Sequence, residues 1–196
     1  MRFFGGKSGQ SLIEMLIAIS IVTVALLGIL VLVNRAVGLN RVTADHYTGT
    51  YLAAEGIELV KNLFDKKFLE SAAGSRSFYG WSSIQPGVYY MSYDDLSVKT
   101  SRCSISGEPT QSSVRDLLFS CQSRDIILYK SANGFLKHDQ TAEPSKFKRV
   151  IIVDKPSQYS GPLNLEFRVT SAVGWETRGG KFVVQLQDHF LPWRLP

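Results

Sequence analysis

An apolar run close to the N-terminus constrains this chain more than any other feature. The 19 residues from Met15 to Val33 carry no charge, and only Ser20 and Thr23 interrupt them with polar side chains. As an α-helix at about 1.5 Å per residue, the run would be about 28 Å long, close to the hydrocarbon thickness of a bilayer. The run therefore predicts a helix that spans a membrane, with most of the 196 residues on one side of it.

The charges beside the run indicate its direction. Arg2 and Lys7 precede it, so the positive-inside rule predicts a cytoplasmic N-terminus, although Arg35 and Arg41 follow closely and weaken that bias. The run is longer than the core of a secretory signal peptide, and no small-residue cleavage site follows it promptly. An uncleaved single-span anchor fits the hydropathy equally well.

One carboxylate bears on these alternatives. Glu14 stands just before the run, and Leu12 and Ile13 already extend the apolar stretch around it. A carboxylate within a membrane helix costs about 3 kcal/mol, and such residues usually have a partner and a function. The other interpretation is a glutamate that reaches the cytoplasmic headgroups at the end of an ordinary anchor. From this residue alone, both remain open.

The segment Gly-Gln-Ser-Leu-Ile-Glu, residues 9–14, follows a short basic leader and leads into the apolar run. In this it resembles the class III signal of type IV prepilins and pseudopilins. The resemblance implies that a prepilin peptidase cuts between Gly9 and Gln10 and methylates the new α-amine of Gln10. It also implies that Glu14, the fifth residue of the mature chain, directs filament assembly. Phenylalanine is the commonest first residue in the family, so Gln10 is a departure.

The chemistry of such a signal can be stated physically. A newly cut chain has a free α-amine on a helix whose first N–H groups are unsatisfied. When the apolar helices of several subunits bundle, that amine and the Glu14 carboxylate of a neighbour can pair in a low-dielectric setting. Such a pair would fix the axial register between subunits, as a buried polar residue does in a coiled coil.

The rest of the chain predicts an α+β protein, and the resemblance implies that its fold is pilin-like. We expect a leader at residues 1–9, a transmembrane and assembly helix at 10–33, an amphipathic continuation at 34–70 and a globular antiparallel β head at 71–196. Apolar residues at helical spacing should hold the continuation against the head; they are Leu52, Ala53, Gly56, Ile57, Val60, Leu63 and Phe64. Charged residues should occupy the opposite face; they are Glu55, Glu58, Lys61 and Asp65.

Short β-rich segments follow the helix. The predicted strands are residues 88–93, 126–129, 147–153, 163–170 and 182–186, with turns at Asn133–Gly134 and Gly179–Gly180. A helix followed by consecutive strands favours an antiparallel sheet. The basic cluster at 146–149 is interpreted as a solvated strand edge rather than a phosphate-binding patch, so no specific nucleic acid is predicted as a partner despite the net charge of +5.

No motif for catalysis is found in the sequence. His46, His138 and His189 are isolated, and neither a nucleophile elbow nor a P-loop is present. The pair Asp94–Asp95 is interpreted as a solvated turn rather than a calcium site. No metal, no cofactor and no enzymatic activity are therefore predicted.

The two cysteines, Cys103 and Cys121, both fall on the predicted outer side of the membrane. A pair in an exported domain favours one disulfide over a zinc site or free thiols. The aromatics of the head are expected in its core, and contact with a ligand at a filament tip is the alternative for them; they are Tyr89, Tyr90, Trp175 and Trp193.

The resemblance implies a subunit of a type IV pilus-like filament for adhesion, motility or DNA uptake. A minor pilin is favoured, and a major pilin stays open. The expected partners of the subunit are other pilin subunits, the prepilin peptidase, the inner-membrane assembly platform and, before assembly, membrane lipid. Its expected location is the inner membrane with the N-terminus cytoplasmic, and then a cell-surface or periplasmic filament. A pseudopilin of a type II secretion system is one alternative. An uncleaved, membrane-anchored extracellular binding protein is another.

Overall fold

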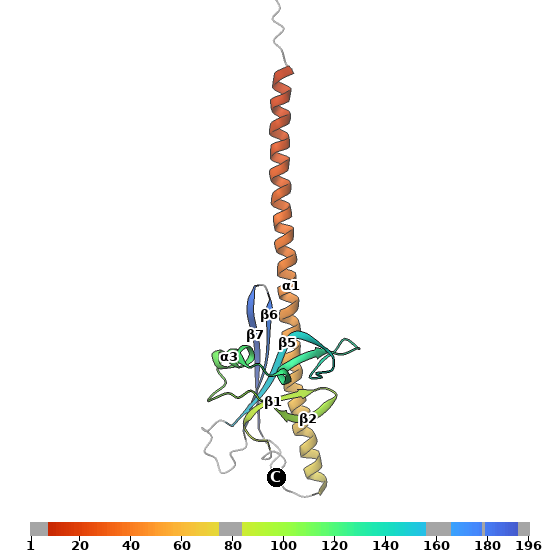
Figure 1. Cartoon of the computed structure of the whole chain (residues 1–196), viewed down its shortest axis with the longest axis vertical. Coiled ribbons are helices and arrows are strands. Elements are labelled where there is room, and N and C mark those ends of the chain that lie inside the picture. The colour runs from red at the N-terminus through yellow and green to blue at the C-terminus, as the bar shows by residue number, and fades with distance from the viewer. Residues whose placement is uncertain (1–7, 75–83, 156–165, 178, 192–196) are drawn as a thin grey trace, which may run out of the picture. The chain divides into compact units, whose positions relative to one another are not determined.

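The structure, a computed structural model, describes residues 8–74, 84–155, 166–177 and 179–191. It divides into two compact units, Met1–Asp45 and His46–Pro196. The helix α1 (Ser8–Gly74) begins in the first unit and ends in the second (Figure 1). The unit boundary falls inside the segment 34–70 that the sequence predicts as the amphipathic continuation.

The first unit is helical in its described part and exposes apolar side chains on every side. The large apolar residues between Leu12 and Val33 are each 52–70% exposed. The polar residues of this stretch form hydrogen bonds to the helix backbone through their hydroxyl groups. Ser20 Oγ donates to the carbonyl of Leu16 at 2.7 Å, and Thr23 Oγ1 donates to the carbonyl of Ile19. Neither hydroxyl then presents an unsatisfied donor to an apolar environment. By length and composition, α1 is able to cross a membrane.

The second unit contains a seven-stranded antiparallel sheet. Its strands are β1 (Gly87–Ser92), β2 (Asp95–Thr100), β3 (Ile127–Lys130), β4 (Leu136–Lys137), β5 (Glu143–Asp154), β6 (Phe167–Thr177) and β7 (Gly180–Phe190). On one side of β5 the sheet continues through β6 to β7. On the other side β3 pairs with the first half of β5 and β1 with the second half, and β4 and β2 lie outside them.

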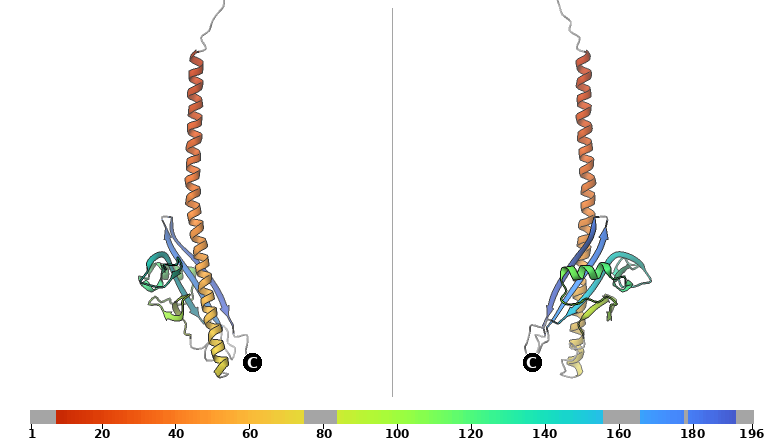
Figure 2. Two further views of the ribbon diagram at one scale, coloured as in Figure 1. Left: turned by 90° about the vertical axis from the view of Figure 1, so that its right-hand side faces the viewer. Right: turned by 60° about the vertical axis from the view of Figure 1, so that its left-hand side comes forward.

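The sheet is covered on both faces. The part of α1 in the second unit lies on one face, and α3 (Gln111–Ser120) lies on the other (Figure 2). Alternation along β5 divides the core accordingly: Ile151 and Val153 pack with α1, whereas Val150 and Ile152 pack with α3. The helical contributors are Leu59, Val60, Leu63 and Phe64 of α1 and Val114, Leu117 and Leu118 of α3.

Small residues allow α1 to approach the sheet closely. A Cβ atom added at Gly49 would lie 2.6 Å from Cζ3 of Trp175, and one added at Gly56 would lie 2.2 Å from Oγ of Ser171. Ala53, between them, is fully buried. Trp175 is 1% exposed, and its ring stacks on Phe182. The spacing of small residues along α1 thus makes room for the largest side chain of the core.

Much of the sequence prediction is confirmed. The fold is α+β, with a long N-terminal helix followed by an antiparallel sheet. The predicted helix stripe is buried apart from Ile57, which is only partly buried. Asn133–Gly134 forms the turn between β3 and β4, where Gly134 has a φ of +83° that favours glycine. The predicted strand at 163–170 is observed from Phe167 as β6, and Leu163 and Leu165 lie outside the described residues.

Four elements of the described part of the head were not predicted: β2, β4, α3 and the short 3-10 helix η1 (Arg124–Ile126). The helix α3 is short and begins with polar residues, so its sequence pattern is weak. Its N-cap is Thr110, whose Oγ1 accepts the backbone N–H of Ser113 at 3.3 Å. Its apolar side gains its partners only when the sheet has formed. The head is therefore not purely β.

The interpretation of residues 146–149 as a solvated strand edge is wrong. This cluster lies in β5, which has neighbouring strands on both sides. Arg149 is fully buried. The interpretation treated the four residues as one group, whereas alternation along a strand sends them to opposite faces.

Candidate functional site

The predicted processing site lies at the beginning of α1. The helix begins at Ser8, so the backbone of Gly9 and Gln10 is already helical. Glu14 follows one turn later with an exposed side chain. Cleavage between Gly9 and Gln10 would leave a helix whose new α-amine precedes Glu14 by four residues, about 6 Å along the axis.

The surroundings of Glu14 are apolar. Ile13 and Met15 are 61% and 65% exposed, and Ile17, almost one turn further on, is 55% exposed. Along α1 the next basic residue after Glu14 is Arg35. Within the described part of the chain, Glu14 has no ion pair. Covering such a carboxylate with lipid or protein is costly unless a cation pairs with it.

A second glutamate of α1 has the opposite environment. Glu55 Oε1 lies 3.0 Å from the Nη1 atom of Arg149, whose guanidinium also donates to the carbonyls of Leu52 at 3.2 Å and Met91 at 2.8 Å. These contacts tie α1 to both β5 and β1. The sequence interpretation placed Glu55 on the outer face of the helix, which is wrong for this residue. The alternation that places Arg149 on the same face as Phe147 and Ile151 could have indicated its burial.

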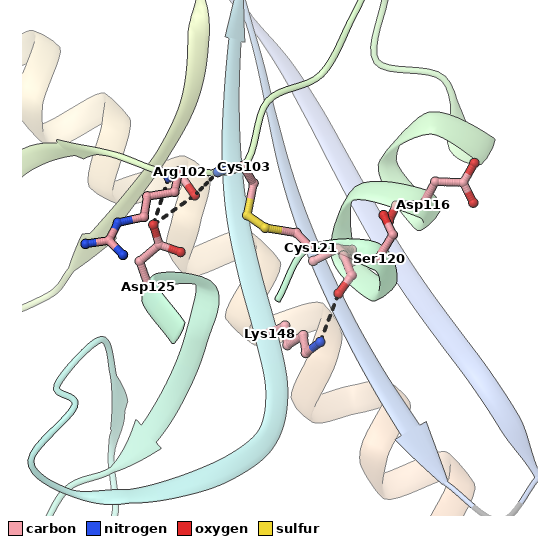
Figure 3. Close-up of a disulfide and its surroundings, with 9 residues drawn as sticks. Arg102, Cys103, Asp116, Ser120, Cys121, Asp125 and Lys148 are labelled. Atoms are coloured by element: carbon pink, nitrogen blue, oxygen red, sulfur yellow. Dashed lines mark hydrogen bonds between the residues drawn. A yellow bond between two sulfur atoms is a disulfide. The ribbon is translucent and has the colours of Figure 1, made fainter. Parts of the chain in front are cut away.

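Cys103 and Cys121 are joined in a disulfide, with their Cα atoms 6.0 Å apart (Figure 3). The bond links the segment after β2 to the C-terminal end of α3. At that end Lys148 Nζ donates to the carbonyl of Leu118 at 3.1 Å, a favourable place for a cation beside helix carbonyls. The disulfide and Lys148 together fix the end of α3 over the sheet.

Asp125 holds the chain leading into the disulfide. Its Oδ2 accepts the backbone N–H of Arg102 at 2.9 Å and the hydroxyl of Ser101 at 3.2 Å. Burial raises the pKa of Asp125, but hydrogen bonds from Ser123, Arg102 and Ser101 outweigh burial and hold that pKa below its ordinary value. Asp125 is therefore a charged anchor inside the head.

The other polar candidates from the sequence form structural contacts. Asp94 pairs with Lys137 at 2.9 Å, and Asp95 pairs with Lys99 at 2.8 Å. Within the ranges that the structure describes, no group of three His, Cys, Asp or Glu side chains could hold a metal ion. Of the aromatics that were candidates for ligand contact, Tyr89 and Trp175 are buried, Tyr90 is partly buried and Trp193 lies outside the described residues.

Comparison with protein families identifies the N-terminal segment. The model of the prokaryotic N-terminal methylation motif matches residues 5–30. This prepilin-type motif is a signature of type IV pilins, and the matched residues include Gly9, Gln10 and Glu14. No curated protein and no solved structure matches the chain.

Proposed function

We propose that this chain is a minor pilin, a subunit of a type IV pilus-like filament that assembles through the N-terminal part of α1. The observation that carries the proposal is the methylation motif at residues 5–30, which leads directly into an exposed apolar helix. The motif supports a pilin-like or pseudopilin subunit. The head supports a structural role, because its polar clusters are used for internal contacts such as that between Arg149 and Glu55.

The N-terminal part of α1 serves two environments in turn. Before assembly its apolar side chains, each more than half exposed in the chain itself, are covered by lipid of the inner membrane. In the filament they are covered by the same helix of other subunits. Because both environments are apolar, the transfer costs little hydrophobic free energy, and polar contacts decide whether it proceeds.

Glu14 supplies that polar contact. Cleavage after Gly9 creates an α-amine on Gln10, which the prepilin peptidase then methylates. In the filament, Glu14 of one subunit pairs with the α-amine of a neighbour and sets the register between them. Removing one partner of a well-buried ion pair costs about 3–5 kcal/mol, because the other charge is left uncompensated. The assembly platform of the inner membrane is the machinery expected to deliver the subunit.

Processing is tested by intact-mass measurement after co-expression with a prepilin peptidase. The mature chain should begin at Gln10 and carry one added methyl group. Gly9→Glu should block the cut, because a bulky charged residue then stands where the glycine was. An uncut wild-type chain, or a cut beyond residue 30, would exclude prepilin processing and would favour the uncleaved membrane-anchored binding protein.

Assembly is tested with Glu14→Ala and Glu14→Gln, scored by quantitative blotting of sheared filaments against membrane fractions. Both variants should insert and be cleaved normally, since loss of a charge makes membrane insertion easier. Both should be strongly depleted from filaments. Ser20→Ala is the matched control, because the Ser20 hydroxyl donates to the carbonyl of Leu16 in its own helix. If wild type and all three variants enter filaments equally, Glu14 does not have the proposed role. Incorporation into a secretion pseudopilus would instead assign the chain to the pseudopilins.

A further inference from the structure

One edge of β5 pairs with two different strands, β3 and β1, and the place where one pairing ends and the other begins is a split in the sheet. The buried cation of Arg149 lies at this split. Along one edge of β5, pairing with β3 extends as far as Lys148, and pairing with β1 begins at Ile151. Arg149 lies between these two pairings. Its fully buried guanidinium reaches the carbonyl of Met91, near the end of β1, and that of Leu52 on α1. One side chain thus satisfies carbonyl groups of two elements next to the split.

His138 lies next to the same split. Its backbone N–H donates to Oγ of Ser92 at 3.0 Å, at the end of β1, and its ring centroid lies 5.5 Å from that of Tyr90. Both ring nitrogens are closed off from solvent. His138 directly follows β4, so it connects the β3–β4 hairpin to the end of β1.

Charged and titratable groups from several elements act on the ring. Arg149 on β5 opposes a positive charge on His138, whereas Asp125 and the backbone carbonyls of Asp125 and Ile127 favour one. Tyr90 faces the ring from β1, and Glu55 of α1 is engaged by Arg149. The flanking Lys137 and Asp139 pair with each other at 3.2 Å, and Lys137 also pairs with Asp94.

We propose that His138 is an acid-sensitive latch: its protonation places a second cation beside Arg149, opens the contact between the end of β1 and the β3–β4 hairpin, and weakens the attachment of α1 to the sheet. Burial, and then the charge of Arg149, lower the pKa of His138 to about 3, from an ordinary value of 6.5. Because the folded pKa is depressed, the neutral ring stabilises the head fully above pH 6.5. That stabilisation is lost as the pH falls from 6.5 towards 3.

The expected effect is large. Through this one group, the equilibrium constant for unfolding should rise about tenfold for each pH unit below 6.5 until the folded ring itself titrates. Carboxylates of the head also make the unfolding constant depend on pH. A variant with a neutral residue at position 138 keeps that contribution. The contribution of the latch is the difference between the two chains.

The direct test is histidine NMR on the full mature chain in detergent micelles. The spectrum also contains the signal of His46, which is exposed and whose ring edge packs on Trp175, so the two rings are assigned separately with the His46→Gln variant. The His138 signal should remain that of a neutral imidazole at pH 5. Titration of His138 above pH 6 would overturn the proposal.

The second measurement is denaturant unfolding from pH 7 to pH 4.5 for wild type, His138→Gln and the control His46→Gln. Wild type and His46→Gln should lose stability more steeply than His138→Gln, by about a hundredfold in the unfolding constant over two pH units. Parallel curves would overturn the proposal. If His138→Gln does not fold, hydrogen exchange of the wild type tests the proposal instead. In acid, amides of β1, β4 and residues 52–64 should open before those of β6 and β7, and uniform opening would contradict a local latch.

Discussion

In α1, the residues before Asp45 and those after His46 are both rich in apolar side chains, but only the second group is buried within the chain. Leu26 and Leu30 are 55% and 59% exposed, whereas Val60 and Phe64 are 2% and 1% exposed. The earlier residues are apolar on every side of the helix, and the later ones form a stripe with charges opposite. A stripe can be buried by one sheet, but an apolar cylinder must be enclosed by lipid or by several helices.

The two glutamates of α1 differ in the same way. Glu55 has its counter-charge within the chain, at Arg149. Glu14 has none in the part of the chain that the structure describes, and the arrangement proposed above supplies one from another subunit. The head therefore contains the partner of Glu55, whereas the proposed partner of Glu14 lies on another molecule.

Removing the first unit should have the largest effect. A chain beginning at His46 should lose membrane association entirely yet keep a folded head, because residues 46–196 contain all three described core clusters. Membrane fractionation and cooperative thermal unfolding measure the two outcomes. A truncated chain that aggregates or unfolds without cooperativity would show that the head needs the first unit.

Arg149→Ala should destabilise the head more than any of the other single substitutions. It leaves the carbonyls of Leu52 and Met91 without their buried donor and removes the partner of Glu55. The expected cost is about 3–5 kcal/mol in the free energy of unfolding. Glu55→Gln should cost less, since that side chain is 33% exposed. Equal, small effects in denaturant titrations would mean that the ion pair does not hold α1 to the sheet.

Loss of the disulfide should destabilise the head by about 3 kcal/mol, the chain-entropy value for a loop of this size. Cys103 and Cys121 are 18 residues apart. Non-reducing peptide mapping of the exported protein should recover the bridge, and the double serine variant should unfold at lower denaturant. The first unit contains no cysteine, so membrane insertion of that variant should be unchanged. Two thiols that alkylate without a reductant would contradict the bridge.

The parts of the molecule that the sequence predicted are those with local patterns. The apolar run, the helix stripe and the short β-rich segments observed as β5 and β7 can each be recognised within a few residues. The environment of Arg149 depends on Leu52 and Met91, which are far from it in sequence, so composition alone suggested an exposed cation. The helix α3 depends on packing against β5 and β6 for the same reason. For Gly9, Gln10 and Glu14 the sequence motif carries the information, because their proposed partners lie outside the chain.

The smallest effect is expected for a glycine-to-alanine substitution, which can be made once in each unit of the chain. Gly49→Ala would place a Cβ atom 2.6 Å from Cζ3 of Trp175, whereas Gly38→Ala meets no atom within 4 Å. The Trp175 ring cannot move aside easily, because it is 1% exposed and packs between Phe147 and Phe182. Gly49→Ala should therefore cost about 1–3 kcal/mol of head stability, the usual range for overpacking.

Gly38→Ala should leave the unfolding of the head unchanged, since position 38 lies in the first unit and its added methyl group is exposed. In the helix itself alanine is favoured over glycine by about 1 kcal/mol. The same preference acts at Gly49. A net loss of stability at that position therefore means that the clash with Trp175 costs more than the gain in helix propensity. Thermal unfolding of both variants and of wild type, monitored by near-ultraviolet circular dichroism, separates the cost of the clash from the gain in helix propensity. If Gly49→Ala melts at or above the wild-type temperature, the close approach of α1 to Trp175 is not what positions the helix on the sheet.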